Sequence, residues 1–307
     1  MIARALSPLA RRIAGLLHAL RLFWIARALV NRLPPGARLW VSRLQVRLGY
    51  MDGLTLVPEA ALQRSFAGAL RLLADARDPG ATDTPAARPA VYLEFGVYVG
   101  TSLACMARAA DELAAGNGTG AATGAGPGVL RIIGFDSFEG MPAGAADEQR
   151  PGLGTGQLYS DVALTRANLR RLGVSPDRVE LVPGWFDASL TAATRERLGL
   201  VAADVVMIDC VIESATRTAL DFVLPLVGDG TVIFFDDWSV FDFEERDLGE
   251  KAAFEDWTAE HPELAVERLP KLEYSPDARA FLVARSTSPS DREPAAAAAA
   301  ALPGAGR

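Results

Sequence analysis

The sequence predicts an α/β fold: a mostly parallel sheet with helices on both of its faces. The first observation is a set of short, almost continuously apolar segments, which is the pattern of strands buried on both faces. The second is that segments with helical spacing separate these strands, and such alternation produces parallel sheets. The third is that the 307-residue chain, 50% hydrophobic and 22% charged, has ordinary globular composition and enough length for one large α/β domain.

Seven strands are expected, and five of them alternate with helices. The alternating strands are residues 90–95, 130–135, 178–183, 204–209 and 231–237. Helical spacing is present in residues 56–77, 101–113, 161–173 and 214–227. Residues 264–284 contain two further apolar segments around the turn sequence SPDAR, which predicts a closing antiparallel hairpin.

The chain divides into an arm, a domain and a tail. Residues 1–51 contain nine Arg and no Asp or Glu, and they are expected to form a basic, apolar helical arm. Residues 52–285 are expected to form the α/β domain. Residues 286–307 are rich in Ala and have the low complexity of a disordered tail. The glycine-rich residues 114–128 lack the Lys-Ser/Thr pair of a phosphate loop, which favours a surface insertion.

The arm has two interpretations. The first is a helical cap on the domain or a partly ordered tail. The second is an interfacial helix that contacts an anionic membrane, or a contact with a second copy of the chain in a homo-oligomer. Arg12, Arg21 and Arg27 interrupt its apolar run, so no segment approaches the ~20 apolar residues of a membrane-spanning helix. The arm also lacks the cleavage site of a signal peptide. With Cys105 and Cys210 as the only cysteines, we expect a cytoplasmic protein, with peripheral membrane contact as the alternative.

The acidic charge of the chain argues against a nucleic-acid partner. The net charge is −7, and the residues outside the arm carry 22 basic and 38 acidic side chains. Because an acidic domain is poorly suited to a phosphate backbone, no nucleic-acid partner is expected. Two His and two Cys are too few for a zinc site of the usual kind.

Acidic residues follow four of the five alternating strands. In an open parallel sheet, ligands bind beyond the carboxyl ends of the strands. The acids at these ends are Glu94, Asp136, Asp209, Asp236 and Asp237. A single Asp at such a position often caps the following helix. Several acids on one rim would repel one another, so together they predict a cation or a hydroxyl-rich ligand.

The first and second strand ends predict a nucleoside-like ligand. Gly96 and Gly100 follow the first strand and would let a ligand approach the backbone. Their spacing is not the tight Gly-x-Gly-x-x-Gly, so a nucleoside without a pyrophosphate is favoured. Asp136 is placed to accept hydrogen bonds from ribose hydroxyls. Phe186 offers a face for an adenine, with packing in the core as the alternative.

Five segments point to a family. They are EFGVYVGTS, GFDSFEGMP, TGQLYSDV, PGWFDASL and FFDDW, in this order between residues 90 and 285. Together they resemble the macrocin-type O-methyltransferases. The resemblance implies a class I methyltransferase (Rossmann-like) fold with a reversed final strand. It also implies S-adenosylmethionine as the cofactor and a small-molecule or glycan acceptor, commonly a sugar hydroxyl.

The resemblance assigns roles to particular residues. Cofactor contacts are expected from Glu94, Gly96, Val97, Tyr98, Gly100, Thr101, Asp136, Ser137, Phe138, Glu139, Gly140 and Phe186. Asp209, Asp236 and Asp237 stand where better-known members bind Mg²⁺. The chain departs from the family pattern Asp-x-Asp-x-Tyr, because Val211 and Glu213 replace the second Asp and the Tyr. Either that Asp is dispensable, or Glu213 substitutes for it, or the activity is altered.

The expected function is Mg²⁺-assisted O-methylation of a sugar or a glycosylated small molecule. A sulfonium methyl is electrophilic, so the enzyme must align the acceptor hydroxyl and remove its proton, with Asp209 as the candidate catalytic residue. An NAD-dependent short-chain oxidoreductase would need a tighter glycine fingerprint and a Tyr-x-x-x-Lys pair, which neither Lys251 nor Lys271 completes. The other alternative is a non-catalytic or metal-independent methyltransferase-fold protein that acts as a membrane- or partner-associated binding module. Val211 is its main support.

Overall fold

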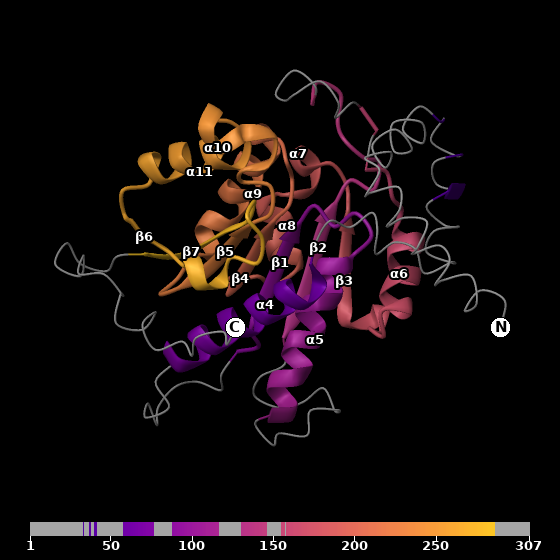
Figure 1. Cartoon of the computed structure of the whole chain (residues 1–307), viewed down its shortest axis with the longest axis horizontal. Helices are drawn as coiled ribbons and strands as arrows, with labels where there is room; N and C mark the ends of the chain where they lie inside the picture. Colours follow the sequence, from indigo (N-terminus) through magenta and orange to yellow (C-terminus); the bar gives the residue numbers. More distant parts are fainter. Residues whose placement is uncertain are drawn as a thin grey trace.

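The structure is a computed structural model of the chain (Figure 1). It describes residues 58–76, 88–116, 130–145, 155–156 and 158–285, and the separate positions 33, 37, 40 and 41. Most of the predicted arm, most of the glycine-rich stretch and the predicted tail lie outside the described residues, so the expectations for them stay predictions. Among the described helices, none is both long enough and apolar enough to cross a membrane.

Within the described residues, seven strands form one sheet in the order β3-β2-β1-β4-β5-β7-β6 (Figure 1). They are β1 (Val91–Phe95), β2 (Arg131–Asp136), β3 (Val179–Pro183), β4 (Val205–Ile208), β5 (Thr231–Phe235), β6 (Leu264–Arg268) and β7 (Arg279–Arg285). The first five run parallel, whereas β7 is antiparallel to both β5 and β6. The predicted mostly parallel sheet with a reversed final strand is confirmed.

The connection between the two closing strands is longer than the expected turn at SPDAR. Residues 269–278 join β6 to β7 and include the short 3-10 helix η5 (Pro270–Leu272). Leu269 and Leu272 are each 3% exposed, so the connection packs on the core because of its own apolar side chains. β7, the later strand, lies between β5 and β6, and β6 forms the edge of the sheet.

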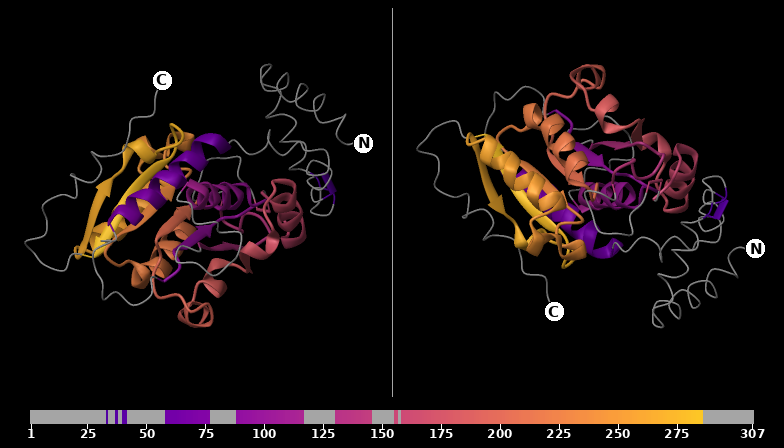
Figure 2. Two further views of the ribbon diagram at one scale, coloured as in Figure 1. Left: turned by 90° about the horizontal axis from the view of Figure 1, so that it is seen from below. Right: turned by 90° about the horizontal axis from the view of Figure 1, so that it is seen from above.

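Helices cover both faces of the sheet (Figure 2). One face carries α4 (Glu59–Ala76), α5 (Thr101–Gly116) and α6 (Val162–Arg171), and the other carries α7 (Phe186–Ser189), α9 (Glu213–Val223) and α11 (Gly249–Glu260). Shorter segments are η2 (Pro176–Arg178), α8 (Ala192–Arg197), η3 (Leu224–Leu226), η4 (Val240–Asp242) and α10 (Phe243–Arg246). Because successive strand residues point to opposite faces, the sheet separates two apolar cores.

Aromatic contacts fasten helices to both faces. Phe66 of α4 meets Tyr92 and Phe234 edge to face, with ring centres 5.4 and 5.3 Å away. On the other face, Phe222 of α9 lies 6.0 Å from Phe95 in a similar arrangement. Rings at these distances and angles attract one another beyond the area that they bury. Helical spacing in the sequence predicted α4, α5, α6 and α9, but it did not identify α7 or α11.

The strand order creates a switch point between β1 and β4. From β1 the chain moves outward through β2 to β3, then returns to β4 on the other side of β1 and continues to β5. Where the connections from two neighbouring strands run in opposite directions, a crevice forms beyond the carboxyl ends of those strands. The N–H of Asp209 donates to the carbonyl of Phe95 at 2.9 Å, so the first residue beyond β4 stays in register with β1. The acids predicted from the sequence therefore share one end of the sheet.

Glu94 is a fully buried carboxyl on β1. The Tyr92 hydroxyl donates to its Oε2 at 2.6 Å, and the Ser102 hydroxyl donates to its Oε1 at 2.7 Å. Burial raises the pKa of Glu94 to about 8, although the two hydrogen bonds favour the charged form. Because Ser102 lies in the first turn of α5, the buried carboxyl joins strand and helix. Its contact with a cofactor stays a prediction.

We predict that Glu94→Gln becomes more stable relative to the parent protein as the pH rises. The pKa of the folded state, about 8, lies above the ordinary 4.5, so the folded protein retains a proton that the unfolded chain has lost. The stability of the parent therefore falls from about pH 4.5 to 8 by up to about 1.4 kcal/mol per pH unit from this group. Glutamine does not ionise. It can keep both contacts, because one hydroxyl can donate to its amide oxygen and the other can accept from its amide N–H group.

Urea denaturation at about pH 5 and about pH 8 measures the difference in free energy of unfolding between variant and parent. Glu112→Gln, at an exposed position of α5, is the matched control for loss of a carboxylate. If Glu94→Gln and the parent lose stability equally over this range, the assignment of a proton to buried Glu94 is wrong.

Candidate functional site

Gly96 lies at the switch point and leaves no room for a side chain. Its φ is +90°, and a Cβ built on it would lie 1.9 Å from the carbonyl oxygen of Asp209. The sequence suggested that a glycine here admits a ligand to the backbone. The structure gives a different reason, because the neighbouring strand end already occupies that space.

Asp136 fastens the turn between β1 and α5 to the end of β2. Its Oδ2 accepts the N–H groups of Val97 and Tyr98 at 2.8 Å each, and its Oδ1 accepts the N–H of Phe138 at 2.7 Å. Burial raises the pKa of Asp136, while these amide hydrogen bonds act in the opposite direction. The Ser137 side chain adds a further hydrogen bond that lowers this pKa, so contact of Asp136 with a ribose hydroxyl stays a prediction.

Two aromatic residues beside this carboxylate have uncommon backbone conformations. Tyr98 has a φ of 49° and Phe138 a φ of 55°. Side chains other than glycine rarely adopt positive φ, and such strain collects at binding and active sites. The strained residues flank the place where the cofactor is expected.

The remaining predicted cofactor residues surround the same turn. Gly100, with a φ of +77°, directly precedes Thr101, the first residue of α5. After β2, the Ser137 hydroxyl accepts the N–H of Glu139 at 3.1 Å and donates to the carbonyl of Gly140 at 3.2 Å. Both segments are therefore tight turns at the same end of the sheet. Their contact with a cofactor stays a prediction.

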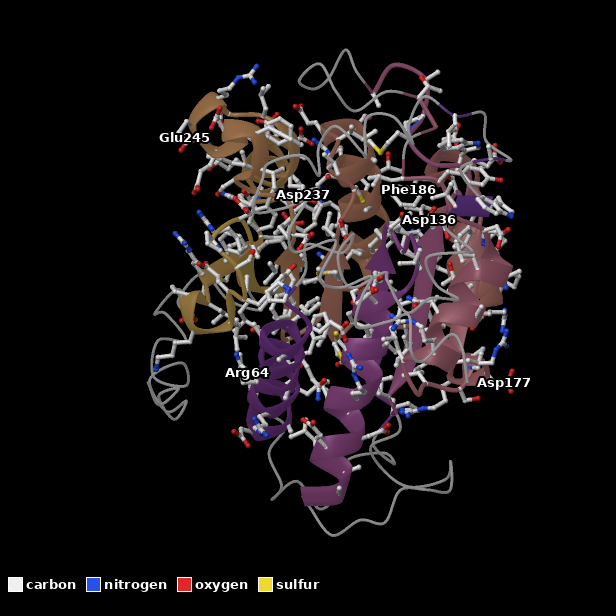
Figure 3. The ribbon with its side chains drawn as sticks, turned by 45° about the vertical axis from the view of Figure 1, so that its right-hand side comes forward. Arg64, Asp136, Asp177, Phe186, Asp237 and Glu245 are labelled. Carbon is white, nitrogen blue, oxygen red and sulfur yellow. The ribbon has the colours of Figure 1, made fainter. Side chains whose placement is uncertain are left out.

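Phe186 lies at the start of α7, beyond the end of β3. In the ladder of β2 and β3, Asp136 pairs with Pro183, which places Phe186 at the same end of the sheet (Figure 3). Its half-buried ring meets the ring of Phe95 edge to face at 6.1 Å. The ring therefore contributes to the core, and its contact with an adenine stays a prediction.

Three carboxylates meet at the ends of β4 and β5. Asp209, Asp236 and Asp237 each offer an oxygen within 4.8 Å of the others, and all three are partly buried. The N–H of Asp236 donates to the carbonyl of Ile208 at 3.0 Å, which fixes its distance from Asp209. Burial raises the pKa of Asp209 well above its ordinary value, and repulsion by Asp236, Asp237 and Glu250 raises it further. We call these three residues the acid triad.

The acid triad fits a hard divalent cation. Carboxylate oxygens are the ligands that Mg²⁺ prefers, and three carboxylates with added waters can complete its shell. A cation between the carboxylates would also relieve the repulsion that raises the pKa of Asp209.

Tyr274 and Glu250 support the acid triad, and sequence reasoning missed both. The Tyr274 hydroxyl donates to Oδ1 of Asp236 from the connection between β6 and β7. Burial raises the pKa of Asp236, whereas this hydrogen bond lowers it. Glu250 lies in the first turn of α11 and is fully buried. Neither residue belongs to a motif, and only the three-dimensional fold brings them to the acids.

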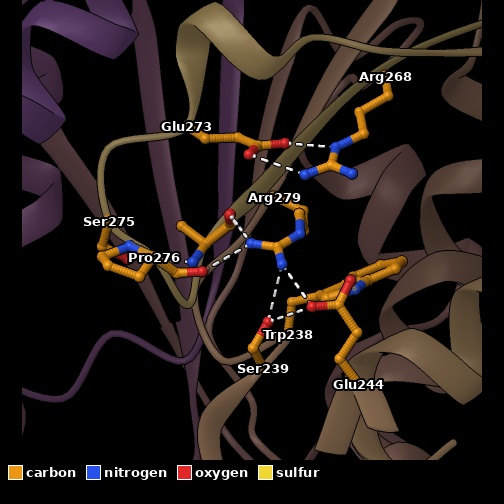
Figure 4. A network of polar contacts seen from close by, with 9 residues as sticks. Trp238, Ser239, Glu244, Arg268, Glu273, Ser275, Pro276 and Arg279 are labelled. Atoms are coloured by element: carbon orange, nitrogen blue, oxygen red, sulfur yellow. Dashed lines mark hydrogen bonds and ion pairs between the residues drawn. The ribbon is translucent and has the colours of Figure 1, made fainter.

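A polar network holds the segment that follows Asp237 (Figure 4). The Arg279 guanidinium donates to the Ser239 hydroxyl at 3.0 Å and pairs with Glu244, while the Trp238 indole donates to Glu244 at 3.2 Å. Burial would raise the pKa of Glu244, but the hydrogen bond from Ser239 and the charge of Arg279 lower it overall. The start of β7 therefore anchors the chain just beyond the acid triad.

Val211 does not join the acids. It is 6% exposed and packs in an apolar cluster with Met141, Ala145, Ile212 and Phe243. Its φ is 65°, and the N–H of Ile212 donates to the carbonyl of Cys210 at 2.7 Å, which makes a three-residue turn around Val211. Such a turn is strained for a β-branched residue. Val211 therefore has a packing role. Glu213 is the first residue of α9, and its substitution for the missing Asp stays a prediction.

Comparison with known proteins gives three findings. A family model described as a methyltransferase domain matches residues 93–238. A relative from Streptomyces olivaceus, 8-demethyl-8-(2,3-dimethoxy-alpha-L-rhamnosyl)-tetracenomycin-C 4'-O-methyltransferase, is 33% identical over 116 residues, which are 36% of this chain and 42% of the relative. The chain thus spans less than half of that relative's length. The solved structure of the O-methyltransferase NovP has a TM-score of 0.50 and 19% identity, and covers 73% of this chain and 80% of that chain.

These findings agree with the sequence and the structure. The family model and the relative confirm the resemblance to O-methyltransferases that the motifs predicted. The solved structure supports the fold alone. The matched residues begin within β1 and end just beyond the acid triad, so they include every residue of the predicted site.

We predict that Gly96→Ala destabilises the protein by ~2–4 kcal/mol. The substitution adds a methyl group against the Asp209 carbonyl and also places alanine at a positive φ. Urea denaturation measures the loss. Gly173→Ala is the matched control, because Gly173 has a φ of +81° with nothing within 4 Å of the added carbon. Equal losses in the two variants would mean that the close approach of Asp209 costs nothing.

We predict that Asp136→Ala weakens S-adenosylmethionine binding by ~1–3 kcal/mol, because the variant loses both the support of the turn and a ribose acceptor. Isothermal titration calorimetry measures the dissociation constant. Asp204→Ala is the control: this aspartate also accepts a backbone N–H, from Val91 at 2.7 Å, but lies at the opposite end of the sheet. Unchanged affinity in a folded Asp136→Ala variant would remove the assignment.

Proposed function

We propose, since residues 93–238 match a model of a methyltransferase domain and the chain has a class I methyltransferase fold, that the protein methylates a hydroxyl group with S-adenosylmethionine. The acceptor class that we propose is a sugar or a glycosylated small molecule. The rhamnosyl group in the printed name of the Streptomyces olivaceus relative supports this class. The observation that carries the proposal is that the three carboxylates of the acid triad lie together next to the end of β1, where the turn to α5 begins.

The cofactor would occupy the ends of β1, β2 and β3. The turn from Gly96 to Thr101 and the segment from Asp136 to Gly140 would hold its ribose and amino acid parts, and Phe186 would contact its adenine. When bound, S-adenosylmethionine supplies an electrophilic methyl group. The part of the chain in this step is to orient the acceptor oxygen in line with that methyl group and to exclude water.

The acid triad would bind the acceptor side of the site. When bound, Mg²⁺ would lower the pKa of a hydroxyl that it contacts. Asp209 is the residue that we propose to take the acceptor proton on its carboxylate, because it follows β4 at the switch point. In the absence of a cation, burial and neighbouring charges raise its pKa and thus its basicity. Asp236 and Asp237 would hold the cation, and Tyr274 would keep Asp236 in its orientation.

A metal-independent methyltransferase is the second candidate. The same raised pKa of Asp209 favours it, because a carboxylate of raised pKa can accept a proton without a cation. The two candidates share the cofactor, the acceptor and the base. They differ in whether the site needs a divalent cation.

We predict that turnover requires a divalent cation. The assay uses rhamnosylated tetracenomycins and related glycosides as acceptors, and mass spectrometry detects the added methyl group. Chelation should abolish turnover and Mg²⁺ should restore it, because the cation lowers the barrier to deprotonation of the acceptor. The Asp236→Asn variant should still bind S-adenosylmethionine, but its turnover number should fall by about a hundredfold or more. Loss of a group that assists proton transfer or holds the cation usually has an effect of this size.

Asp187→Asn is the matched control, because Asp187 is exposed on α7 beyond the end of β3. Full turnover in excess chelator would decide for the metal-independent candidate. Absence of S-adenosylmethionine binding would reject both candidates.

A further inference from the structure

Glu250 connects the two strand ends that carry the acid triad. Its Oε1 accepts the N–H of Cys210 at 3.3 Å, and its Oε2 accepts the N–H of Asp237 at 2.9 Å. Cys210 directly follows Asp209, so one carboxylate binds the main chain at the ends of both β4 and β5. These two hydrogen bonds span 40 and 13 residues of sequence.

The surroundings of Glu250 are unusual for a carboxylate. The side chain is fully buried, and in the described part of the chain no lysine or arginine forms an ion pair with it. The carboxylates that face it are those of Asp209, Asp236 and Asp237. A buried acid among other acids is costly, so a residue of this kind is expected where it has a specific task.

The start of α11 also fits tightly against the turn at Val211. Gly249 has a φ of +63°, and a Cβ built on it would lie 2.7 Å from Cδ2 of Phe243 and 3.2 Å from the Val211 carbonyl oxygen. Only glycine therefore allows Glu250 to approach the Cys210 amide from this side. The strained turn at Val211 presents that amide to the carboxylate.

We propose that Glu250 is a positioning residue that sets the distance between Asp209 and Asp237 and so shapes the acid triad for a divalent cation. The cation part of this inference rests on the proposed function. Glu250 acts through main-chain hydrogen bonds, and it contacts neither the acceptor nor the cofactor. Its loss should therefore affect cation binding and leave cofactor binding intact.

The test is Glu250→Gln. Glutamine has nearly the same shape but only one acceptor oxygen, so its amide group would face one of the two N–H donors. Glu255→Gln is the matched control, because Glu255 lies on the same helix, is exposed and pairs with Lys251. Asp209→Asn is the benchmark for direct loss of a predicted cation ligand.

Three measurements separate the possible outcomes. Electron paramagnetic resonance gives the affinity for Mn²⁺ in the presence of S-adenosylhomocysteine, calorimetry gives the affinity for S-adenosylhomocysteine, and hydrogen–deuterium exchange reports the amides of residues 209–212 and 236–238. For Glu250→Gln we expect Mn²⁺ binding to weaken by about tenfold to a hundredfold, the usual effect of residues that support metal ligands. We expect unchanged S-adenosylhomocysteine affinity and faster exchange in both segments, with Glu255→Gln like the parent.

Parent-like Mn²⁺ affinity and parent-like exchange in Glu250→Gln would overturn the inference. If neither the parent nor Asp209→Asn binds Mn²⁺, the metal-assisted form of the proposed function fails. Exchange then decides the role of Glu250 alone: faster exchange in both segments supports a positioning residue, and unchanged exchange rejects it.

Discussion

The contact between Gly96 and the Asp209 carbonyl is the constraint on which the site depends. The absence of a side chain at Gly96 lets the ends of β1 and β4 lie together at the switch point, and the N–H of Asp209 joins them by its hydrogen bond to the Phe95 carbonyl. From there, main-chain hydrogen bonds extend the arrangement to both sides. Asp136 fixes the turn after β1, and the amide of Asp236 fixes the end of β5 against β4. The acids are therefore positioned by the backbone and not by contacts among their own side chains.

The site concentrates negative charge and satisfies it with neutral donors. Asp136 accepts three amides, Glu250 accepts two amides, and Asp236 accepts the hydroxyl of Tyr274. Hydrogen bonds of this kind keep buried carboxylates in place without neutralising them. The resulting field favours a cationic ligand, and both the sulfonium of S-adenosylmethionine and a divalent metal ion are cationic.

Much of the fold and the outline of the site follow from local sequence. Apolar segments separated by helical spacing specify parallel strands, and parallel strands bring the acids that follow them to one end of the sheet. What local sequence does not give is the direction of each side chain. Glu94 points into the interior, and Val211 packs away from the acid triad in an apolar cluster.

Glu250 and Tyr274 could not be found from the sequence for a related reason. Each reaches the site from a later element of the chain, 13 residues beyond Asp237 for Glu250 and 38 beyond Asp236 for Tyr274, and no motif or spacing marks its contact. The placement of β7 has a further consequence for how the protein folds. Because β7 lies between β5 and β6, the sheet cannot close before Arg285 has been synthesised, and Tyr274 and Arg279 arrive with the same late segment. Pairings of this long range form slowly, so the edge of β5 stays open and Asp236 lacks the hydroxyl of Tyr274 until this segment is in place.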